Sequence, residues 1–220
     1  MAKKHRFERA EAGLRRAKPK KRPYDRMLIV CEGAKTEVNY FLAMRRELRI
    51  PGADIQIVHS PLGTEPIQIV ESAEQLFGAS KAFDRVFAVF DRDDHLTYNN
   101  ALAKAVALDG KLKNDNGKAV PFMAVPSVPN FEFWLLLHFK NVLAFMPRAD
   151  VYAELRKAAH YPAYAKNCLT VYSDTKASIP LATQRAEHLR GLYTPHTGTD
   201  PYTDADILTG YFTTFAKRLA

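Results

Sequence analysis

The sequence predicts an α/β protein with a mostly parallel, doubly wound sheet and a helical C-terminal extension. Short apolar runs alternate four times with segments of helical periodicity between residues 27 and 139, an order typical of parallel strands joined by helices. The run at residues 85–91 (RVFAVFD) is apolar almost throughout, as expected of a strand that is covered on both faces. After about residue 145 the pattern changes to helices and loops without convincing strands.

The four predicted strands occupy residues 27–31, 53–60, 85–91 and 119–127, and the last of them follows a polar turn (KNDNG). A helix is predicted after each strand, over residues 35–48, 65–77, 96–108 and 130–139. Apolar residues recur at helical spacing in the first of these helices. The fourth helix begins after Asn130, a residue type that is favoured at the N-cap.

The C-terminal part of the chain is predicted to be helical and to pack on the same domain. Helical spacing runs through residues 149–160 and 182–193, and a loop rich in Gly, Pro and Thr then leads to a final helix. We therefore divide the chain into a basic, flexible leader (1–24), an α/β domain (25–142) and the helical part (143–220).

Composition narrows the functional classes. A chain of 220 residues with 47% hydrophobic content is ordinary for a globular protein, and no apolar run approaches the roughly 18 residues that a membrane helix needs. No apolar segment follows the basic N-terminus closely, so a secretory signal is not expected. Cys31 and Cys168 lie far apart in the sequence and predict neither a metal cluster nor a disulfide. We expect a cytoplasmic protein that does not bind membranes.

The net charge of +8 belongs to the N-terminal segment. Residues 1–26 contain eleven Lys or Arg and three Asp or Glu, which leaves 21 of each sign in the other 194 residues. The leader is either a solvated segment without further role or an arm that adds sequence-independent affinity for phosphates.

Acidic residues follow two of the predicted strands. Glu32 comes after the first strand, and Asp91 and Asp93 come at the end of the third. Open parallel sheets bind ligands at the carboxyl ends of their strands, and carboxylate oxygens suit a hard cation such as Mg²⁺. Segment 28–37 (LIVCEGAKTE) is not a P-loop, because Ile29 and Ala34 occupy the two positions that must be glycine.

These acids resemble the Toprim signature shared by topoisomerases, primases, recombination proteins and a group of nucleases. The segments LIVCEGAKTEVNYF, VFDRDDH and PNFEFWLLLHF, in this order, resemble the RloB-like family of bacterial anti-phage proteins, and the likeness extends over residues 20–215. The segment DPYTDADIL resembles that family less closely.

The resemblance implies a Toprim-like fold in which Glu32 acts as a general acid/base or metal ligand, and in which Asp91 and Asp93 hold Mg²⁺, with Mn²⁺ as a substitute. A divalent cation stabilises charge on a phosphoryl oxygen and lowers the pKa of bound water. Glu132, just beyond the fourth strand, is predicted either to complete this acidic, catalytic site or to stabilise the start of its helix.

Five other residues are weaker candidates. Lys35 is either a phosphate contact or a solvated lysine, and Thr36 is expected to hydrogen-bond the local backbone. Glu37 lies in the first turn of the same helix. His95 is either a proton shuttle or a structural residue, and His138, among apolar neighbours, is expected in the core.

The sequence thus favours a Mg²⁺-dependent, Toprim-type nuclease that acts on the phosphodiesters of DNA or RNA in anti-phage defence by abortive infection. The resemblance also implies an ATPase partner protein. The alternative is a non-catalytic Toprim module that binds nucleic acid or serves as a scaffold for such a partner. A phosphatase of the haloacid dehalogenase type is disfavoured, because His95 stands where that family has Thr or Val. The oligomeric state stays open.

Overall fold

The computed structural model describes residues 24–196 and 201–219, and these residues form a five-stranded sheet between layers of helices. The strands are β1 (Met27–Cys31), β2 (Ile55–His59), β3 (Arg85–Asp91), β4 (Phe122–Val128) and β5 (Tyr202–Thr203). They lie in the order β2-β1-β3-β4-β5, with β1 to β4 parallel and β5 antiparallel to β4. The prediction of an α/β protein with a mostly parallel sheet is therefore confirmed.

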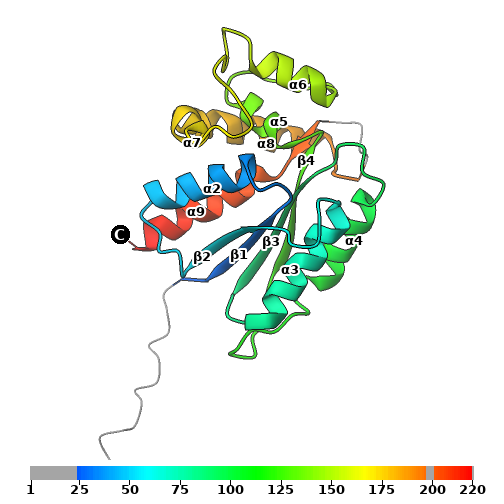
Figure 1. Cartoon of the computed structure of the whole chain (residues 1–220), viewed down its shortest axis with the longest axis vertical. Coiled ribbons are helices and arrows are strands. Elements are labelled where there is room, and N and C mark those ends of the chain that lie inside the picture. The colour runs from blue at the N-terminus through cyan, green and yellow to red at the C-terminus, as the bar shows by residue number, and fades with distance from the viewer. Residues whose placement is uncertain (1–23, 197–200, 220) are drawn as a thin grey trace, which may run out of the picture.

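Helices cover both faces of this sheet (Figure 1). On one face, α2 (Thr36–Glu47) lies beside α9 (Ala205–Leu219), and the rings of Phe41 and Phe212 stack with centroids 5.7 Å apart. On the other face lie α3 (Pro66–Ser80) and α4 (Tyr98–Leu108). The doubly wound arrangement follows from this placement of the connecting helices.

The alternation of side chains along β1 explains why two cores form. Met27, Ile29 and Cys31 point into one cluster of buried residues, whereas Leu28 and Val30 point into the other. Every residue of β1 is buried, because successive residues of a strand face opposite sides of the sheet and both sides are covered here.

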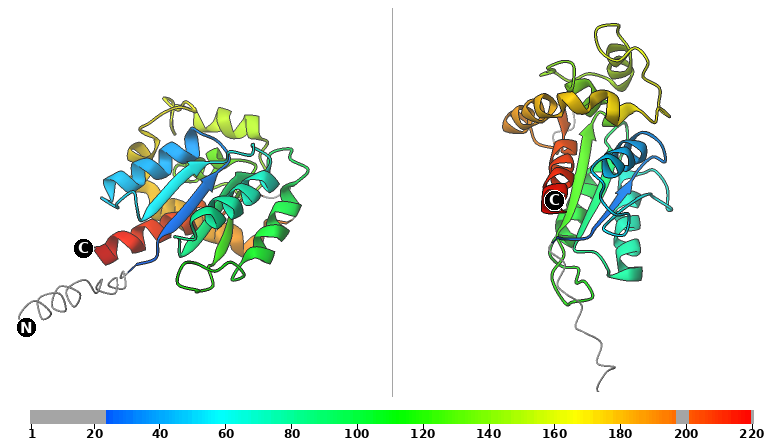
Figure 2. Two further views of the ribbon diagram at one scale, coloured as in Figure 1. Left: turned by 60° about the horizontal axis from the view of Figure 1, so that its bottom comes forward. Right: turned by 90° about the vertical axis from the view of Figure 1, so that its left-hand side faces the viewer.

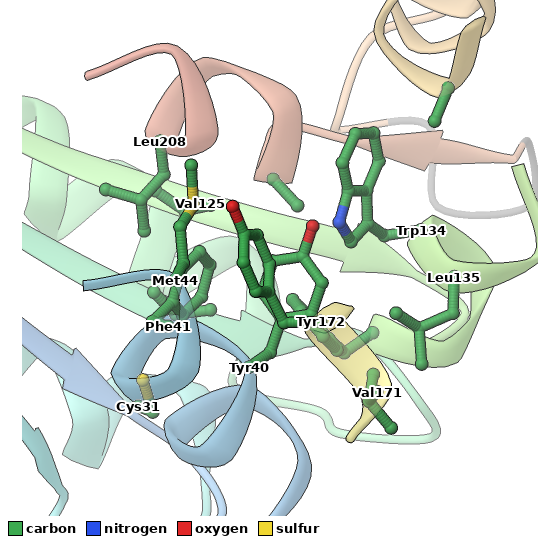
Figure 3. Close-up of a cluster of buried hydrophobic side chains, with 14 of the residues drawn as sticks. Cys31, Tyr40, Phe41, Met44, Val125, Trp134, Leu135, Val171, Tyr172 and Leu208 are labelled. Carbon is green, nitrogen blue, oxygen red and sulfur yellow. The ribbon is translucent and has the colours of Figure 1, made fainter. Parts of the chain in front are cut away.

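The larger core also receives α5 (Phe131–Leu137), in which all seven residues are buried. Figure 3 shows Trp134 and Leu135 of this helix near Tyr40 of α2 and Tyr172 of α7 (Val171–Thr175). The core thus joins the sheet to the C-terminal helices.

The remaining helices extend beyond the end of the sheet at which the parallel strands finish (Figures 1 and 2). They are α6 (Arg148–Leu155), the short 3-10 helix η1 (Lys176–Ser178) and α8 (Ile179–Leu192). None of the helices in the described part of the chain is long and apolar enough to cross a membrane.

Several boundaries differ from the predictions. The expectation of no strand after residue 145 is wrong, because β5 pairs with β4 through Ser127–Thr203 and Val128–Tyr202. The helix predicted at 149–160 ends at Leu155, and the one predicted at 182–193 begins at Ile179. The predicted leader, residues 1–24, lies outside the described residues except for residue 24.

The strand order places a topological switch point between β1 and β3. From β1 the chain moves outward to β2 and then returns to form β3 on the opposite side of β1. In open parallel sheets, a crevice forms at such a point, outside the carboxyl ends of the two strands. The residues that follow β1 and β3 therefore lie where this fold binds ligands.

Candidate metal and nucleic-acid site

The first two acids of the site are joined directly by the sheet. Glu32 continues the β1 ladder, since its backbone N–H donates to the carbonyl of Val89 over 2.9 Å. Its side-chain Oε2 accepts a hydrogen bond from the backbone N–H of Asp91, also over 2.9 Å. The carboxylate of Glu32 is thus fixed across the gap between the two strand ends.

Asp93 lies in the turn after β3 and adopts a backbone conformation that few side chains tolerate. Its φ is 38°, in the left-handed region, and its N–H donates to the carbonyl of Pro129 over 2.9 Å. Oδ2 forms an ion pair with Arg148 of α6. Oδ1 is buried and has no hydrogen-bond partner among the described residues, so one oxygen of this carboxylate is available to a cation.

His95 joins these two acids. One ligand atom each from Glu32, Asp93 and His95 lies within 4.8 Å of the other two. The imidazole Nε2 is 3.8 Å from Glu32 Oε1, whereas Nδ1 is hydrogen-bonded to Glu65 Oε1 over 3.0 Å. The Thr97 hydroxyl donates to the other oxygen of Glu65 over 2.7 Å.

This arrangement fits a divalent cation by its donor set. A histidine that binds a metal usually directs its second ring nitrogen to a carboxylate or carbonyl, which fixes the ring orientation, and Glu65 occupies that position relative to His95. Two carboxylates and one imidazole suit Mg²⁺ or Mn²⁺, with the nitrogen favouring Mn²⁺. The unpartnered Oδ1 of Asp93 agrees with this assignment.

Behind this group lies a pocket of buried acids. A cavity of about 240 Å³ is lined by the four carboxylates of Glu32, Glu37, Asp91 and Glu132 and by the cationic side chains of Lys35, Arg148 and Lys166. Burial raises the pKa of the Asp91 carboxyl well above its usual range, and the nearby carboxylate of Glu37 raises it further. Burial also raises the pKa of Glu37, to about 7. Asp91 and Glu37 therefore hold protons at pH values at which exposed carboxyls are ionised.

The pKa values of the outer acids are raised less strongly. Burial raises the pKa of Glu32, while the hydrogen bond from the Asp91 backbone opposes that shift. Burial likewise raises the pKa of Asp93, and the charge of Arg148 opposes it. A bound divalent cation would favour the ionised form of both groups.

The three predicted metal ligands differ in how deeply they are buried. Glu32 and Asp93 belong to the group of ligand atoms within 4.8 Å, whose third member is His95. Asp91 is not part of that group and lies deeper, among the buried acids of the pocket. The sequence pattern Asp-x-Asp therefore supplies one outer and one inner carboxylate, because the chain turns at Asp93.

Glu132 lines the same pocket from the first turn of α5. Its Oε1 accepts a hydrogen bond from the Tyr164 hydroxyl over 2.6 Å. Asn130 does occupy the N-cap position, but its side chain makes no capping hydrogen bond. The position of Glu132 is compatible with both predicted roles, because the residue lines the acidic pocket and also lies in the first turn of its helix.

Other candidates have definite places. Lys35 is exposed and lines the pocket. The expectation that Thr36 bonds local backbone is wrong, because its hydroxyl donates to the carbonyl of Lys166, 130 residues away, over 2.9 Å. His138 is buried, as expected of a core residue, and its Nδ1 lies 3.0 Å from the Trp134 carbonyl oxygen.

Arg148, Lys166 and Glu65 were not predicted as site residues. Arg148 and Lys166 come from the C-terminal part, where no sequence motif marks them, and Lys166 also lies 5.2 Å from the ring centroid of Tyr152. Glu65 precedes α3 and is distant in sequence from the acidic motifs. The packing of α6 and of the loop after it over the strand ends brings Arg148 and Lys166 to the site.

The site therefore combines acids that can hold a cation, a buried carboxyl group, Glu37, that can exchange a proton near neutral pH, and cationic groups that can bind a phosphate. A search of curated proteins finds no match to the chain. A search of solved structures likewise finds none. The sequence model of one family, described as RloB-like protein, matches residues 27–210. This match spans most of the chain and includes every site residue described above, so the protein belongs to the RloB-like family.

Proposed function

We propose that this protein is a divalent-metal-dependent nuclease of Toprim type that cleaves the phosphodiester bonds of nucleic acid. The observation that carries the proposal is the group formed by Glu32, Asp93 and His95 at the switch point, with ligand atoms within 4.8 Å of one another. A hard cation in contact with phosphate oxygens is the chemistry that such a donor set serves. The order of the acids after β1 and β3 supports the Toprim assignment.

Glu32, Asp93 and His95 would hold the cation, which is either Mg²⁺, the ion expected from the family resemblance, or Mn²⁺, which the imidazole nitrogen favours. When bound, such a cation stabilises negative charge on a phosphoryl oxygen and lowers the pKa of coordinated water. Glu65 would keep the His95 ring oriented through its hydrogen bond to Nδ1.

The neighbouring side chains would bind the phosphate and move protons. Arg148 and Lys166 line the acidic pocket and can bind a phosphate by donating charge-assisted hydrogen bonds to its oxygens. Glu37, whose pKa is raised to about 7 by burial, is suited to accept or donate a proton near neutral pH.

The direct test is cleavage of DNA and RNA by the full-length chain with and without Mg²⁺ or Mn²⁺. We expect cleavage that requires the metal and that Asp93→Asn abolishes, since the amide removes the ligand charge while it preserves the shape. Asp115→Asn, at an exposed aspartate that does not line the acidic pocket, is the matched control and should retain activity. Absence of cleavage with either metal, with or without a partner protein, would refute the nuclease proposal.

The biological setting that we propose follows from family membership. Resemblance to the RloB-like family supports a cytoplasmic role in anti-phage defence by abortive infection, together with an ATPase partner that controls activity. Phage challenge of cells that carry the wild type or Asp93→Asn tests this role, and loss of protection in the variant is the expected outcome.

A non-catalytic module is the second candidate, because Arg148 already neutralises one oxygen of Asp93. In that case the acidic site would be a binding surface rather than a reaction centre, and nucleic acid or an ATPase partner would be held without cleavage. Full phage protection by Asp91→Ala and Asp93→Asn would favour this reading over the nuclease.

A further inference from the structure

A second cavity opens directly beside the metal-binding residues. Its volume is about 510 Å³, and its walls are formed by residues 92–96 after β3, by Pro129, and by Phe145 and residues 147–149 around the start of α6. A volume of this size lies within the range of about 300–1,000 Å³ found for ligand pockets. Asp93, His95 and Arg148 form part of these walls and already have roles in the chemistry proposed above, whereas the rest of the cavity has none, so a ligand for it must be sought.

The walls combine apolar and cationic surface. Leu96 is 97% exposed and Phe145 is 49% exposed, although both are large apolar side chains. Arg92 and Arg148 lie on the same walls. Among the described residues Arg92 forms no ion pair through its side chain, whereas Arg148 is paired with Asp93. A ligand that satisfies both surfaces must carry a flat apolar face and a negative charge.

Arg148 connects this cavity to the acidic pocket, because it lines both of them. Asp93 likewise faces the larger cavity and contributes to the group of metal-binding atoms. A single ligand in the larger cavity therefore reaches the metal-binding residues without crossing any other surface. Continuity of this kind indicates a substrate subsite rather than a separate binding site.

We propose that this cavity receives an unpaired nucleotide of the substrate strand, next to the phosphodiester that is cleaved. The base would lie against Phe145 and Leu96, and its phosphates would contact Arg92 and Arg148. Only an unpaired base can expose its face to an aromatic side chain in this way, because bases within a duplex are stacked on one another. The inference rests on the proposed nuclease function and specifies its substrate as single-stranded nucleic acid or an unpaired segment.

The charges of the cavity agree with a nucleotide that arrives together with a cation. Asp93 and Asp94 balance the two arginines, so the cavity alone offers little net attraction to a phosphate. A divalent cation at Asp93 would release Arg148 from its ion pair and add positive charge at the boundary with the acidic pocket. Nucleic-acid binding should therefore be measured with a divalent cation present, and Ca²⁺ is the one used here.

The test uses the full-length chain and a short fluorescent oligonucleotide, single-stranded or as a blunt duplex of the same sequence, in DNA and RNA forms. Fluorescence anisotropy with Ca²⁺ should show tighter binding of the single strand. Phe145→Ala should weaken single-strand binding by about five- to 150-fold, the range expected when one stacking contact is lost. Duplex binding, which reports the affinity of the basic leader, should change little.

Three variants make the test specific. Phe145→Trp should retain single-strand binding, because it preserves an aromatic face. Leu143→Ala, two residues away and 43% exposed but outside the cavity walls, is the matched control and should bind like the wild type. Arg92→Gln should reduce the slope of log affinity against log salt by roughly 0.7, the effect of one phosphate contact on a single strand.

Equal binding of single strand and duplex, or equal effects of Phe145→Ala and Leu143→Ala, would overturn the inference. Cleavage assays separate this failure from failure of the proposed function. Metal-dependent cleavage without a single-strand preference would refute the cavity alone. A single-strand preference that depends on Phe145, without cleavage, would refute the nuclease and leave the nucleotide site in place.

Discussion

At the scale of single residues, the loop between β1 and α2 is shaped around a buried carboxyl group. A Cβ atom at Gly33 would lie 3.2 Å from Oε2 of Glu37, which is closer than ordinary van der Waals contact. Glycine at position 33 therefore lets the backbone lie close to the Glu37 carboxylate. In the same segment, the Glu32 side chain bonds to the backbone of Asp91 in β3. The Glu-Gly pair thus has a packing reason as well as a chemical one.

Part of the site could be predicted from single residues. Glu32, Asp91 and Asp93 follow the carboxyl ends of strands that proved to be neighbours, and this placement needs only the strand pattern. The separation of Asp91 from Asp93 in depth could not be predicted, because it depends on the left-handed backbone of Asp93. The contribution of Arg148 depends on how α6 packs, which no local pattern encodes.

Glu132→Gln tests the role of the fourth carboxylate of the pocket. The amide oxygen can still accept the Tyr164 hydroxyl, which Glu132 Oε1 now binds over 2.6 Å, so the fold should be retained. Loss of the charge should lower both metal affinity, measured by calorimetry, and nuclease activity. If Glu132 only stabilises the start of α5, the change should instead cost at most about 1 kcal/mol of stability and leave metal affinity unchanged.

His138 should make stability depend on pH. Burial lowers its pKa from 6.5 to about 4, so the unfolded chain binds a proton more readily than the folded chain between these values. The stabilisation is fully present above pH 6.5 and is lost as the pH falls toward 4, by up to about 3 kcal/mol. Urea unfolding of the wild type and of His138→Gln at several pH values measures this contribution.

The difference between the two proteins is the informative quantity, since other carboxyl groups titrate in the same range. The free energy of unfolding should fall more steeply with acidification in the wild type than in His138→Gln. Parallel pH profiles would show that His138 is protonated in the folded protein, in conflict with its burial.

At the scale of elements, β5 was missed because it contains only two residues. A strand of that length carries no periodic pattern, and it is defined by its partner rather than by its own sequence. Thr203 contributes a hydrogen bond between its Oγ1 and Ser127 Oγ over 2.9 Å. The segment DPYTDADIL, which resembled the family least, thereby has a structural role at the edge of the sheet.

Arg190 of α8 binds residues at this edge of the sheet. Its guanidinium binds both oxygens of Asp206 over 2.6 Å each, and it also donates to the Thr203 carbonyl over 3.1 Å. Asp206 is buried, so Arg190→Ala would leave its charge unpaired inside the protein. We expect a loss of about 3–5 kcal/mol in the free energy of unfolding, measured by chemical denaturation.

A matched control is available on the surface. Lys104 pairs with Glu71 and Glu74 over 3.3 and 3.1 Å, and the three side chains are 31–41% exposed to solvent. Lys104→Ala should cost at most about 1 kcal/mol, as is usual for solvent-screened pairs. Equal losses for Arg190→Ala and Lys104→Ala would mean that Asp206 finds another partner or gains water when Arg190 is removed.

At the scale of the whole molecule, the sheet and the C-terminal part supply different residues of the site. The strand ends supply Glu32 and Asp93, whereas α6 and the loop that follows it supply Arg148 and Lys166 from above the same end of the sheet (Figure 1). The nucleic acid that we propose as substrate would bind between these two parts. The sequence predicted the first part by its strand pattern, but the contribution of the second part depends on long-range packing.

The distribution of charge leads to a prediction for the leader. Residues 1–22 contain ten Lys or Arg and two Asp or Glu, so their removal deletes the entire net charge of +8. Deletion of this segment should leave the thermal transition nearly unchanged and should weaken binding of both single strand and duplex at low salt. The reason is that contacts between basic side chains and phosphates release counterions, which makes the lost affinity sequence-independent and salt-dependent.

A full-length variant in which the ten Lys and Arg of residues 1–22 are replaced by Gln separates charge from chain length. It should behave like the deletion in binding, with a shallower dependence of affinity on salt concentration, and like the wild type in thermal unfolding. Deletion that lowers the melting temperature strongly, while the Gln variant does not, would show that the leader packs on the domain. Binding that survives both changes at low salt would place the electrostatic attraction in the folded domain instead, where Arg92, Arg148 and Lys166 line the two cavities.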